Sequence, residues 1–186
     1  MYIVEVVLVV FLFFNIAVAI AYGFWLIDVL LGGEDYKTRA EAIEIVARVV
    51  KRSNLESGIL YDLGSSRGSF VFGVGTLCPR LTTIGIDNSI LRTLFARFRR
   101  KFIKAETPPV FLTKNILRAD LSKADIVFIY LPEPLLAALE TKLQKELKFG
   151  ALAITYRVKF PFWQPHEVYK SDFHWGKQNN IFVYQK

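Results

Sequence analysis

The sequence predicts an α/β fold, a doubly wound and mostly parallel sheet, preceded by one membrane-spanning helix. Residues 58–63 are a short apolar run that leads into a glycine- and serine-rich turn and then a helix-like segment. This order is typical of a buried parallel strand that feeds a helix. Residues 81–87 repeat the apolar run and end in an acid, and residues 6–31 are apolar almost throughout.

The turn after the first strand, Asp62-x-Gly64-x-Ser66-x-Gly68, predicts a ligand site. Glycine permits backbone angles and a close ligand approach that a Cβ would block. The helix that follows would point its free N–H groups at a ligand over the turn. Asp87, at the end of the second strand, is placed to accept hydrogen bonds from both hydroxyls of a ribose. We therefore expect an adenosine-type cofactor. A dinucleotide is disfavoured, because G-x-G-x-x-G would require glycines where serines stand.

The same turn resembles the D/E-x-G-x-G-x-G motif of class I S-adenosylmethionine-dependent methyltransferases, with Ser66 in place of the middle glycine. The resemblance implies a Rossmann-like seven-stranded methyltransferase sheet and S-adenosylmethionine as cofactor. A polar residue after the third strand, residues 110–113, commonly meets the adenine in this class. The implied cofactor-binding residues are Asp62, Gly64, Ser66, Gly68, Asp87 and Asn115.

The charge is distributed unevenly along the chain. The formal net charge is +7, and all 24 Lys and Arg residues follow Tyr36. Such a basic region favours an anionic neighbour, either nucleic acid or an anionic membrane face. The single cysteine, Cys78, excludes an internal disulfide and fits a reducing compartment. His166 and His174 lie far from any acid or cysteine at metal-site spacing, so no metal is expected.

Residues 6–31 predict one uncleaved transmembrane helix, because about 20 apolar residues suffice to span a bilayer. A signal peptide would need a basic segment in front, whereas only Glu5 stands there. Lys37 and Arg39 follow the span, which favours a cytoplasmic domain. We expect an anchor and hinge over residues 1–33, with Asp28 in the headgroup zone, and a catalytic domain over 34–186. The membrane would be a bacterial-type inner membrane, or the mitochondrial inner membrane in a eukaryote.

The remaining segments complete the predicted sheet. A helix over residues 38–52 would cover one face, and strands over 124–131 and 150–158 would flank a helix over 135–148. Residues 166–175 and 180–186 alternate enough to form a closing hairpin.

A basic helix is predicted over residues 90–103. Its apolar residues form a stripe, and three interpretations are open: a core-packed helix with a solvated basic face, a patch for anionic lipid headgroups, or a nucleic-acid site. The basic residues of the segment 90–104 are Arg92, Arg97, Arg99, Arg100, Lys101 and Lys104.

A narrower resemblance rests on three short motifs. Tyr130-Leu131-Pro132, Tyr156-Arg157 and Phe160-Pro161-Phe162-Trp163-x-Pro165 occur in this order. They resemble a family of protein lysine methyltransferases whose mitochondrial members modify the adenine nucleotide translocase and the c-ring protein of the ATP synthase. Those members also carry an N-terminal membrane segment, and archaeal lysine methyltransferases are related. The resemblance covers roughly Tyr36 to the end, but Lys37-Thr38-Arg39 replaces a Pro-Thr-Pro-like segment.

This resemblance implies methylation of a lysine side chain on a protein, with a membrane protein as one candidate. Pro132 would shape the floor of the acceptor channel, and Tyr130 and Glu133 would receive or relay the amine proton. Trp163 would line the channel as a cation–π wall. Alternatively, residues 160–163 form an aromatic plug under the final hairpin. An N-P-P-Y motif is absent after the fourth strand, which disfavours adenine and glutamine as acceptors. Two other functions remain open: an RNA methyltransferase, and a non-catalytic tethered binding module.

Overall fold

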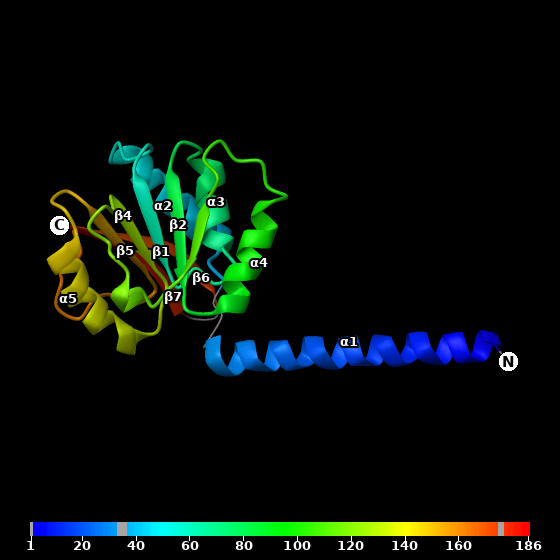
Figure 1. Ribbon diagram of the computed structural model, residues 1–186. Helices are drawn as coiled ribbons and strands as arrows, with labels where there is room; N and C mark the ends of the chain where they lie inside the picture. Colours follow the sequence, from blue (N-terminus) through cyan, green and yellow to red (C-terminus); the bar gives the residue numbers. More distant parts are fainter. Residues whose placement is uncertain (1, 33–36, 175–176) are drawn as a thin grey trace. The chain divides into compact units, whose positions relative to one another are not determined.

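The computed structural model describes residues 2–32, 37–174 and 177–186, and the chain divides into two compact units, residues 1–35 and 36–186. In the first unit, α1 (Tyr2–Gly32) is one continuous helix (Figure 1). Its segment Tyr2–Leu26 is long and apolar enough to cross a membrane by length and composition. The polar amide of Asn15 donates to the Phe11 carbonyl oxygen at 2.7 Å, so this donor is satisfied within the helix. The side chain of Asp28 lies outside the described residues.

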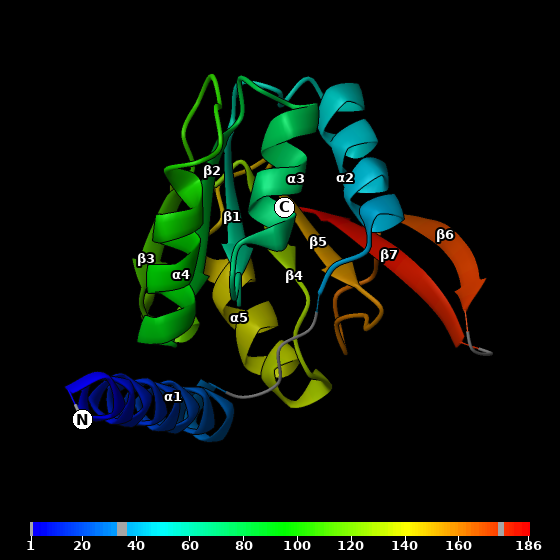
Figure 2. The same ribbon diagram turned by 90° about the vertical axis from the view of Figure 1, so that its right-hand side faces the viewer.

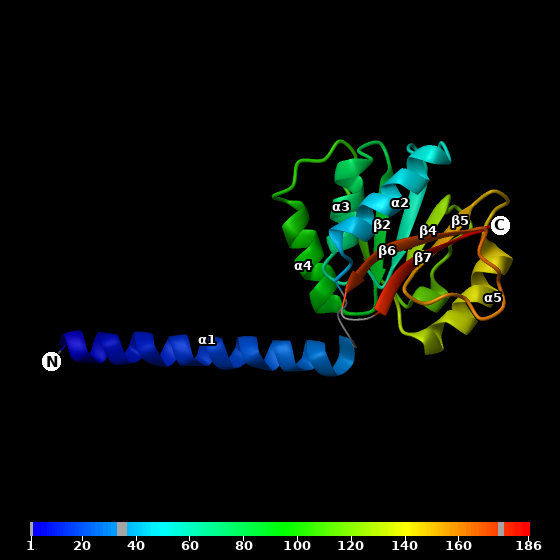
Figure 3. The same ribbon diagram turned by 180° about the vertical axis from the view of Figure 1, so that it is seen from behind.

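The second unit is a seven-stranded sheet in the order β3-β2-β1-β4-β5-β7-β6 (Figure 1). The first five strands are parallel, β7 runs antiparallel to β5, and β6 forms a hairpin with β7 (Figure 3). The predicted fold class is confirmed. The strands are β1 (Ile59–Leu63), β2 (Thr82–Asp87), β3 (Val110–Thr113), β4 (Ile126–Ile129), β5 (Leu152–Tyr156), β6 (Glu167–His174) and β7 (Lys177–Gln185).

Helices cover both faces of the sheet. Figure 2 shows α2 (Ala40–Arg52), α3 (Ser69–Leu77) and α4 (Ile90–Arg100) on one face and α5 (Leu136–Glu146) on the other. Two short 3₁₀ turns complete the domain, η1 (Ile116–Arg118) and η2 (Glu133–Leu135). Because every crossover returns to a parallel strand, the carboxyl ends of β1 to β5 lie at one edge of the sheet.

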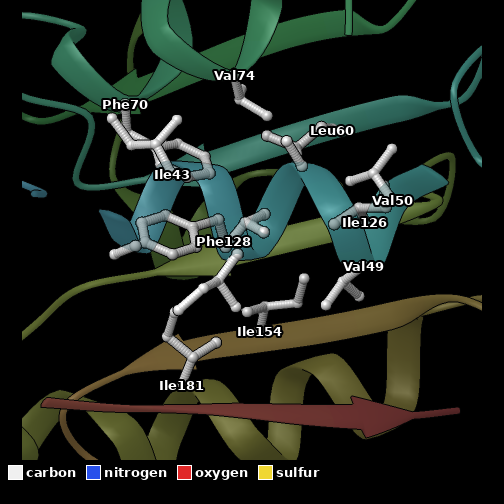
Figure 4. Close-up of a cluster of buried hydrophobic side chains, with 14 of the residues drawn as sticks. Ile43, Val49, Val50, Leu60, Phe70, Val74, Ile126, Phe128, Ile154 and Ile181 are labelled. Atoms are coloured by element: carbon white, nitrogen blue, oxygen red, sulfur yellow. The ribbon is translucent and has the colours of Figure 1, made fainter. Parts of the chain in front are cut away.

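The larger core cluster lies between α2, α3 and the sheet (Figure 4). Apolar residues of α2 recur at helical spacing, and seven of its 13 residues are buried, so one whole face of the helix packs on the strands. Phe70 of α3 stacks on Phe128 of β4 with ring centroids 3.7 Å apart. All residues of β4 and β5 are buried, as expected for central strands covered on both faces.

One helix differs from the sequence-based expectation. Of the three interpretations left open for this helix, the one that packs its apolar stripe on the core is contradicted: α4 buries Arg92, Thr93 and Ala96 instead. Beneath it, Phe72 of α3 and Phe111 of β3 fill the space in a small cluster with Ala96. A small residue therefore fits at this contact better than a large one. Of the larger apolar residues of α4, Leu91 is half-buried and Ile90, Leu94, Phe95 and Phe98 are exposed.

The core contact between Phe70 and Phe128 leads to a stability prediction. Phe128 is fully buried, and Phe128→Ala removes a ring from between α3 and the sheet. We expect a loss of about 3–5 kcal/mol in the free energy of unfolding, because a cavity remains. Urea denaturation of the full chain in detergent measures it. Phe149→Ala is the matched control, since Phe149 is 94% exposed and its loss should cost less than about 0.5 kcal/mol. Equal losses in both variants would contradict this core assignment.

Candidate cofactor and acceptor site

The turn between β1 and α3 has left-handed backbone at alternate residues. Gly64, Ser66 and Gly68 have φ values of +83°, +46° and +77°. A Cβ on Gly64 would lie 2.6 Å from Leu131 Cδ2, and one on Gly68 would lie 2.6 Å from the Phe111 ring. Glycine is therefore required at both positions by conformation and by space. Ser66 adopts the same left-handed backbone conformation at some conformational cost. The turn therefore keeps its shape although serine replaces the middle glycine of the motif.

The end of β2 holds this turn in place. The backbone N–H groups of Gly64 and Ser65 both donate to the Ile86 carbonyl oxygen, at 2.8 and 3.0 Å. The Asp87 carboxylate accepts from the Ser66 N–H through Oδ2 and from the Ser89 N–H through Oδ1, each at 2.8 Å. α3 then begins at Ser69, and no side chain caps its N-terminus. The first N–H groups of the helix therefore lack a side-chain acceptor at this edge of the sheet.

Two carboxylates lie side by side under the turn. Asp62 is 4% exposed and Asp87 5% exposed. Burial, and after it the negative charge of Asp87, raise the pKa of Asp62 well above its ordinary value. Within the described part of the chain, no residue donates a hydrogen bond to the Asp62 carboxylate or forms an ion pair with it. A buried acid in this state is suited to a cationic ligand group.

Asn115 lies at the carboxyl end of β3. Its Oδ1 accepts from the Leu117 N–H at 2.9 Å and so caps η1. The Lys114 N–H donates to the Asp87 carbonyl oxygen at 2.9 Å, which joins this segment to the end of β2. Asn115 and Asp87 thus belong to connected loops at one edge of the sheet, and the adenine contact of Asn115 stays a prediction.

An aromatic and cationic cluster lies at the carboxyl ends of β4 and β5. The half-buried ring of Tyr130 meets Tyr156 edge to face at 4.8 Å. The Arg157 guanidinium lies over both rings, 5.3 Å from the Tyr130 centroid and 5.5 Å from that of Tyr156. Burial raises the pKa of Tyr130, and the positive charges of Arg157 and Arg39 partly oppose this. The Tyr156 hydroxyl is buried and has no hydrogen-bond partner among the described residues.

Arg157 is the residue to which sequence reasoning gave no role. It has a φ of +71°, unusual for a residue with a long side chain, and its N–H donates to the Asn180 carbonyl oxygen at 2.8 Å. Strained residues of this kind gather at functional sites. The only signal in the sequence was its place after Tyr156 in the motif order.

The structure separates the other predicted acceptor residues. Pro132 and Glu133 are exposed and begin η2, directly after Tyr130 and Leu131. Trp163 belongs to the cluster on the α5 face, where it stacks on Phe160 at 5.7 Å and packs against Tyr184 at 5.3 Å. This packing matches the aromatic-plug alternative, although part of the Trp163 ring stays accessible. Its predicted role as a channel wall remains a prediction.

A cavity lies at the opposite end of the sheet from the turn. It has a volume of about 250 Å³ between the end of α2 and the start of β5, and the ion pair of Arg52 and Glu167 lines it. Ligands of doubly wound folds gather at the carboxyl ends of the strands. We therefore place the candidate site at the turn and not in this cavity. Of the described side chains, no three His, Cys, Asp or Glu residues form a group that would hold a metal ion.

Residues 62–167 match the family model of the ANTKMT methyltransferase domain, which is more than half of the chain. The chain belongs to this family. The predicted class, an S-adenosylmethionine-dependent methyltransferase, is thereby confirmed, and the cofactor of the ANTKMT-type domain is S-adenosylmethionine. Asp62, which has no partner among the described residues, fits this molecule, because its methionine part carries an ammonium group.

Two curated relatives of this ANTKMT-type domain are lysine methyltransferases. The human lysine N-methyltransferase of the ATP synthase c-ring protein is 26% identical over 123 residues, which are 66% of this chain and 52% of that protein. The chain thus spans about half the length of the human relative. A protein-lysine N-methyltransferase of Saccharolobus islandicus (strain REY15A) is 24% identical over 130 residues, 68% of this chain and 80% of that protein.

A solved structure shares the fold. An RNA methyltransferase from Salinibacter ruber in complex with S-adenosyl-L-homocysteine superposes with a TM-score of 0.69. It is 20% identical and covers 81% of this chain and 93% of its own. At this identity, the likeness establishes the sheet and its helices and says nothing of the substrate.

The raised pKa of Asp62 predicts a pH-dependent stability. Below the ordinary pKa of an aspartate, the folded and unfolded states both hold the proton. As pH rises, the unfolded state releases its proton first, so the fold loses stability until the pH passes the raised pKa of Asp62. Asp62→Asn should therefore stabilise the cofactor-free protein at pH 8 and gain less at pH 4. Thermal unfolding at both pH values measures the difference.

Asp120→Asn is the control for this experiment. Asp120 is exposed and accepts from the Ser122 N–H at 2.9 Å, which lowers its pKa. Its replacement should give no stabilisation at pH 8. A gain for Asp120→Asn equal to that for Asp62→Asn would contradict the burial argument.

Proposed function

We propose that this protein transfers a methyl group from S-adenosylmethionine to the ε-amine of a lysine on a protein substrate. The observation that carries the site assignment is the contact of Leu131 with the turn: its Cδ2 fills the space that a side chain on Gly64 would need. The end of β4, with Tyr130 and Pro132, is therefore beside the cofactor turn. The lysine methyltransferase relatives support a lysine acceptor.

The cofactor end of the site is assigned to the turn and the two acids. Asp87 would receive the ribose hydroxyls, since its carboxylate lies at the turn, where it accepts from the Ser66 and Ser89 N–H groups. Asp62 would face the ammonium group. Gly64, Ser66 and Gly68 would let the backbone approach the ligand. When bound, S-adenosylmethionine supplies an electrophilic methyl group on a sulfonium sulfur.

The acceptor end must make a neutral amine, because a free lysine holds its proton with a pKa of about 10.4. Arg157 and Arg39 act on Tyr130 as positive charges. A like charge beside an incoming lysine disfavours its ammonium form and lowers its pKa. The raised pKa of Tyr130 keeps the phenol neutral at physiological pH, so its oxygen would orient the amine through a lone pair rather than act as a phenolate base.

The proton released from the amine needs an exit. Glu133 is exposed and lies three residues after Tyr130, at the rim of the site, where it would pass the proton to solvent. Pro132 would fix the direction of the chain between these two residues, since its φ is −59°. Trp163 would contact the aliphatic part of the lysine from the α5 side, through the part of its ring that stays accessible.

The location proposed for the enzyme is a membrane. α1 would be the anchor, and Lys37 and Arg39 follow it within seven residues. The positive-inside rule then places the methyltransferase domain on the cytoplasmic side, or on its equivalent in an organelle. A domain held in this way would meet lysines of membrane proteins or of partners close to the surface.

Cofactor binding tests the role of Asp87. We expect isothermal titration of the full chain in detergent to show binding of S-adenosylmethionine. Asp87→Ala should weaken it by at least about tenfold, because each charge-assisted hydrogen bond contributes about 1.5–3 kcal/mol. Asp120→Ala removes an exposed acid that accepts from the Ser122 N–H and not from the turn, and it should leave the affinity unchanged. Unchanged affinity in Asp87→Ala would refute the assignment.

Methylation of lysine tests the reaction, and Arg157 tests its electrostatics. Mass spectrometry of membranes with and without the enzyme should show methyl groups gained on lysine. With the substrate so found, Arg157→Gln should shift the pH profile of kcat/KM to higher pH, because the amine then keeps its proton longer. Arg80→Gln is the control, because Arg80 pairs with Glu56 on the surface. Methyl incorporation into RNA and into no protein lysine would contradict the proposal, as would cofactor binding without any methyl transfer.

A further inference from the structure

α4 exposes most of its apolar residues to solvent. A surface helix normally buries its apolar stripe, yet here the stripe faces outward and the small and polar residues face the sheet. The exposed fractions of the outward residues lie between 51% and 71%. We call them the α4 outer face: Ile90, Leu94, Phe95, Phe98 and Phe102. Phe98 and Phe102 meet edge to face at 5.0 Å, so the face is a continuous apolar surface.

Basic groups border the α4 outer face. Residues 88–105 contain six Lys and Arg residues and no acid. Arg97 donates twice to the Phe111 carbonyl oxygen, at 2.8 and 3.0 Å, and Arg100 donates to that of Pro109 at 3.1 Å. These bonds hold the guanidinium groups at the border of the face, and each guanidinium retains donors for a phosphate, since it has five. Lys101 and Lys104 are exposed at the end of the helix.

We propose that the α4 outer face inserts into an anionic membrane surface, with the basic border on the lipid phosphates. An apolar helix face with a basic border is typical of helices that lie in the membrane interface. The proposal rests on the proposed membrane anchoring of this methyltransferase. Only four residues separate the end of α1 at Gly32 from Lys37, and they reach at most about 18 Å. An anchored domain would therefore stay within reach of the headgroups.

Charge and composition favour lipid over the other occupants. Two copies of this face would repel each other, because five of the six basic residues of the segment 88–105 are exposed and the segment has no acid. An RNA strand would stack on exposed rings, but the aliphatic Ile90 and Leu94 share the face with them and offer no stacking surface. An interface of lipid headgroups and acyl chains accepts rings and aliphatic side chains alike, and it supplies the negative charge.

The test places a label on the face in the full-length chain. Leu94→Cys carries an environment-sensitive fluorophore, and the protein is reconstituted in nanodiscs of phosphatidylcholine with or without phosphatidylglycerol. Lys145→Cys on α5, exposed and on the opposite face of the sheet, is the matched control. Cys78 is buried and should not react, which the unsubstituted chain verifies. We expect a blue shift and loss of emission by lipid-attached nitroxide at Leu94, stronger with phosphatidylglycerol, and neither effect at Lys145.

A second variant removes the apolar surface and leaves the fold. Phe98→Ser and Phe102→Ser together change two exposed rings, and lipid quenching at Leu94 should then fall towards the level of the control. Phe95 is kept, because the Arg67 guanidinium of the β1–α3 turn lies over its ring at 6.0 Å. Cofactor affinity measured by titration should not change, which separates a failure of docking from a failure of the proposed enzyme function. If alkaline carbonate extracts the full-length chain from membranes, α1 is not a transmembrane anchor. The docking of the α4 outer face can then still be tested by adding vesicles to the labelled protein.

Three outcomes would overturn the proposal. The Leu94 label staying in water in both kinds of disc would exclude insertion. Disulfide formation between two Leu94→Cys chains, without lipid quenching, would identify a second copy as the occupant. Protection of the label by added RNA, and not by anionic lipid, would identify a nucleic-acid surface.

Discussion

The site depends on the attachment of the β1–α3 turn to the end of β2. The Ile86 carbonyl oxygen and the Asp87 carboxylate together accept four backbone hydrogen bonds, three of them from residues 64–66. These bonds fix a turn whose left-handed residues would otherwise be costly. The same carboxylate is the group assigned to the ribose. In the proposed function, one side chain would therefore serve both structure and ligand binding. Burial, and after it the charge of Asp87, raise the pKa of Asp62.

Properties that depend on residues close together in the sequence were predictable, and properties that depend on tertiary packing were not. The turn spacing, the acid after β2 and the order of strands follow from periodicity and short motifs, so the fold and the cofactor class were predictable. The direction of the α4 stripe was not. An amphipathic pattern shows that a helix has an apolar face but does not say what covers it. Only the packing of Phe72 and Phe111 beneath Ala96 shows that the core has no room for larger residues there.

The acceptor side was less predictable for a similar reason. Tyr130 and Trp163 were expected to share one channel, which stays a prediction. Trp163 lies in the segment between β5 and β6, where no strand or helix pattern fixes the direction of its side chain. Tyr130 packs with the α2-face cluster, whereas Trp163 packs with the α5-face cluster. The left-handed backbone of Arg157 has no sequence signature, because it comes from the hydrogen bond of its N–H to the neighbouring β7. Conformation of this kind is set by tertiary contacts and not by residue type.

Charge divides the carboxyl edge of the sheet into two halves. Under the turn lie two buried carboxylates, Asp62 and Asp87, which favour a cationic ligand. At the ends of β4 and β5, Arg157 and Arg39 act on Tyr130, which disfavours a second cation. Leu131 separates the two halves by its contact with the turn at Gly64. In the proposed function, the amino group of the cofactor would be drawn to one half, and a lysine would be pushed towards its neutral form in the other. In the proposed reaction, methyl transfer to a lysine nitrogen would use these two oppositely charged halves at adjacent positions of the carboxyl edge.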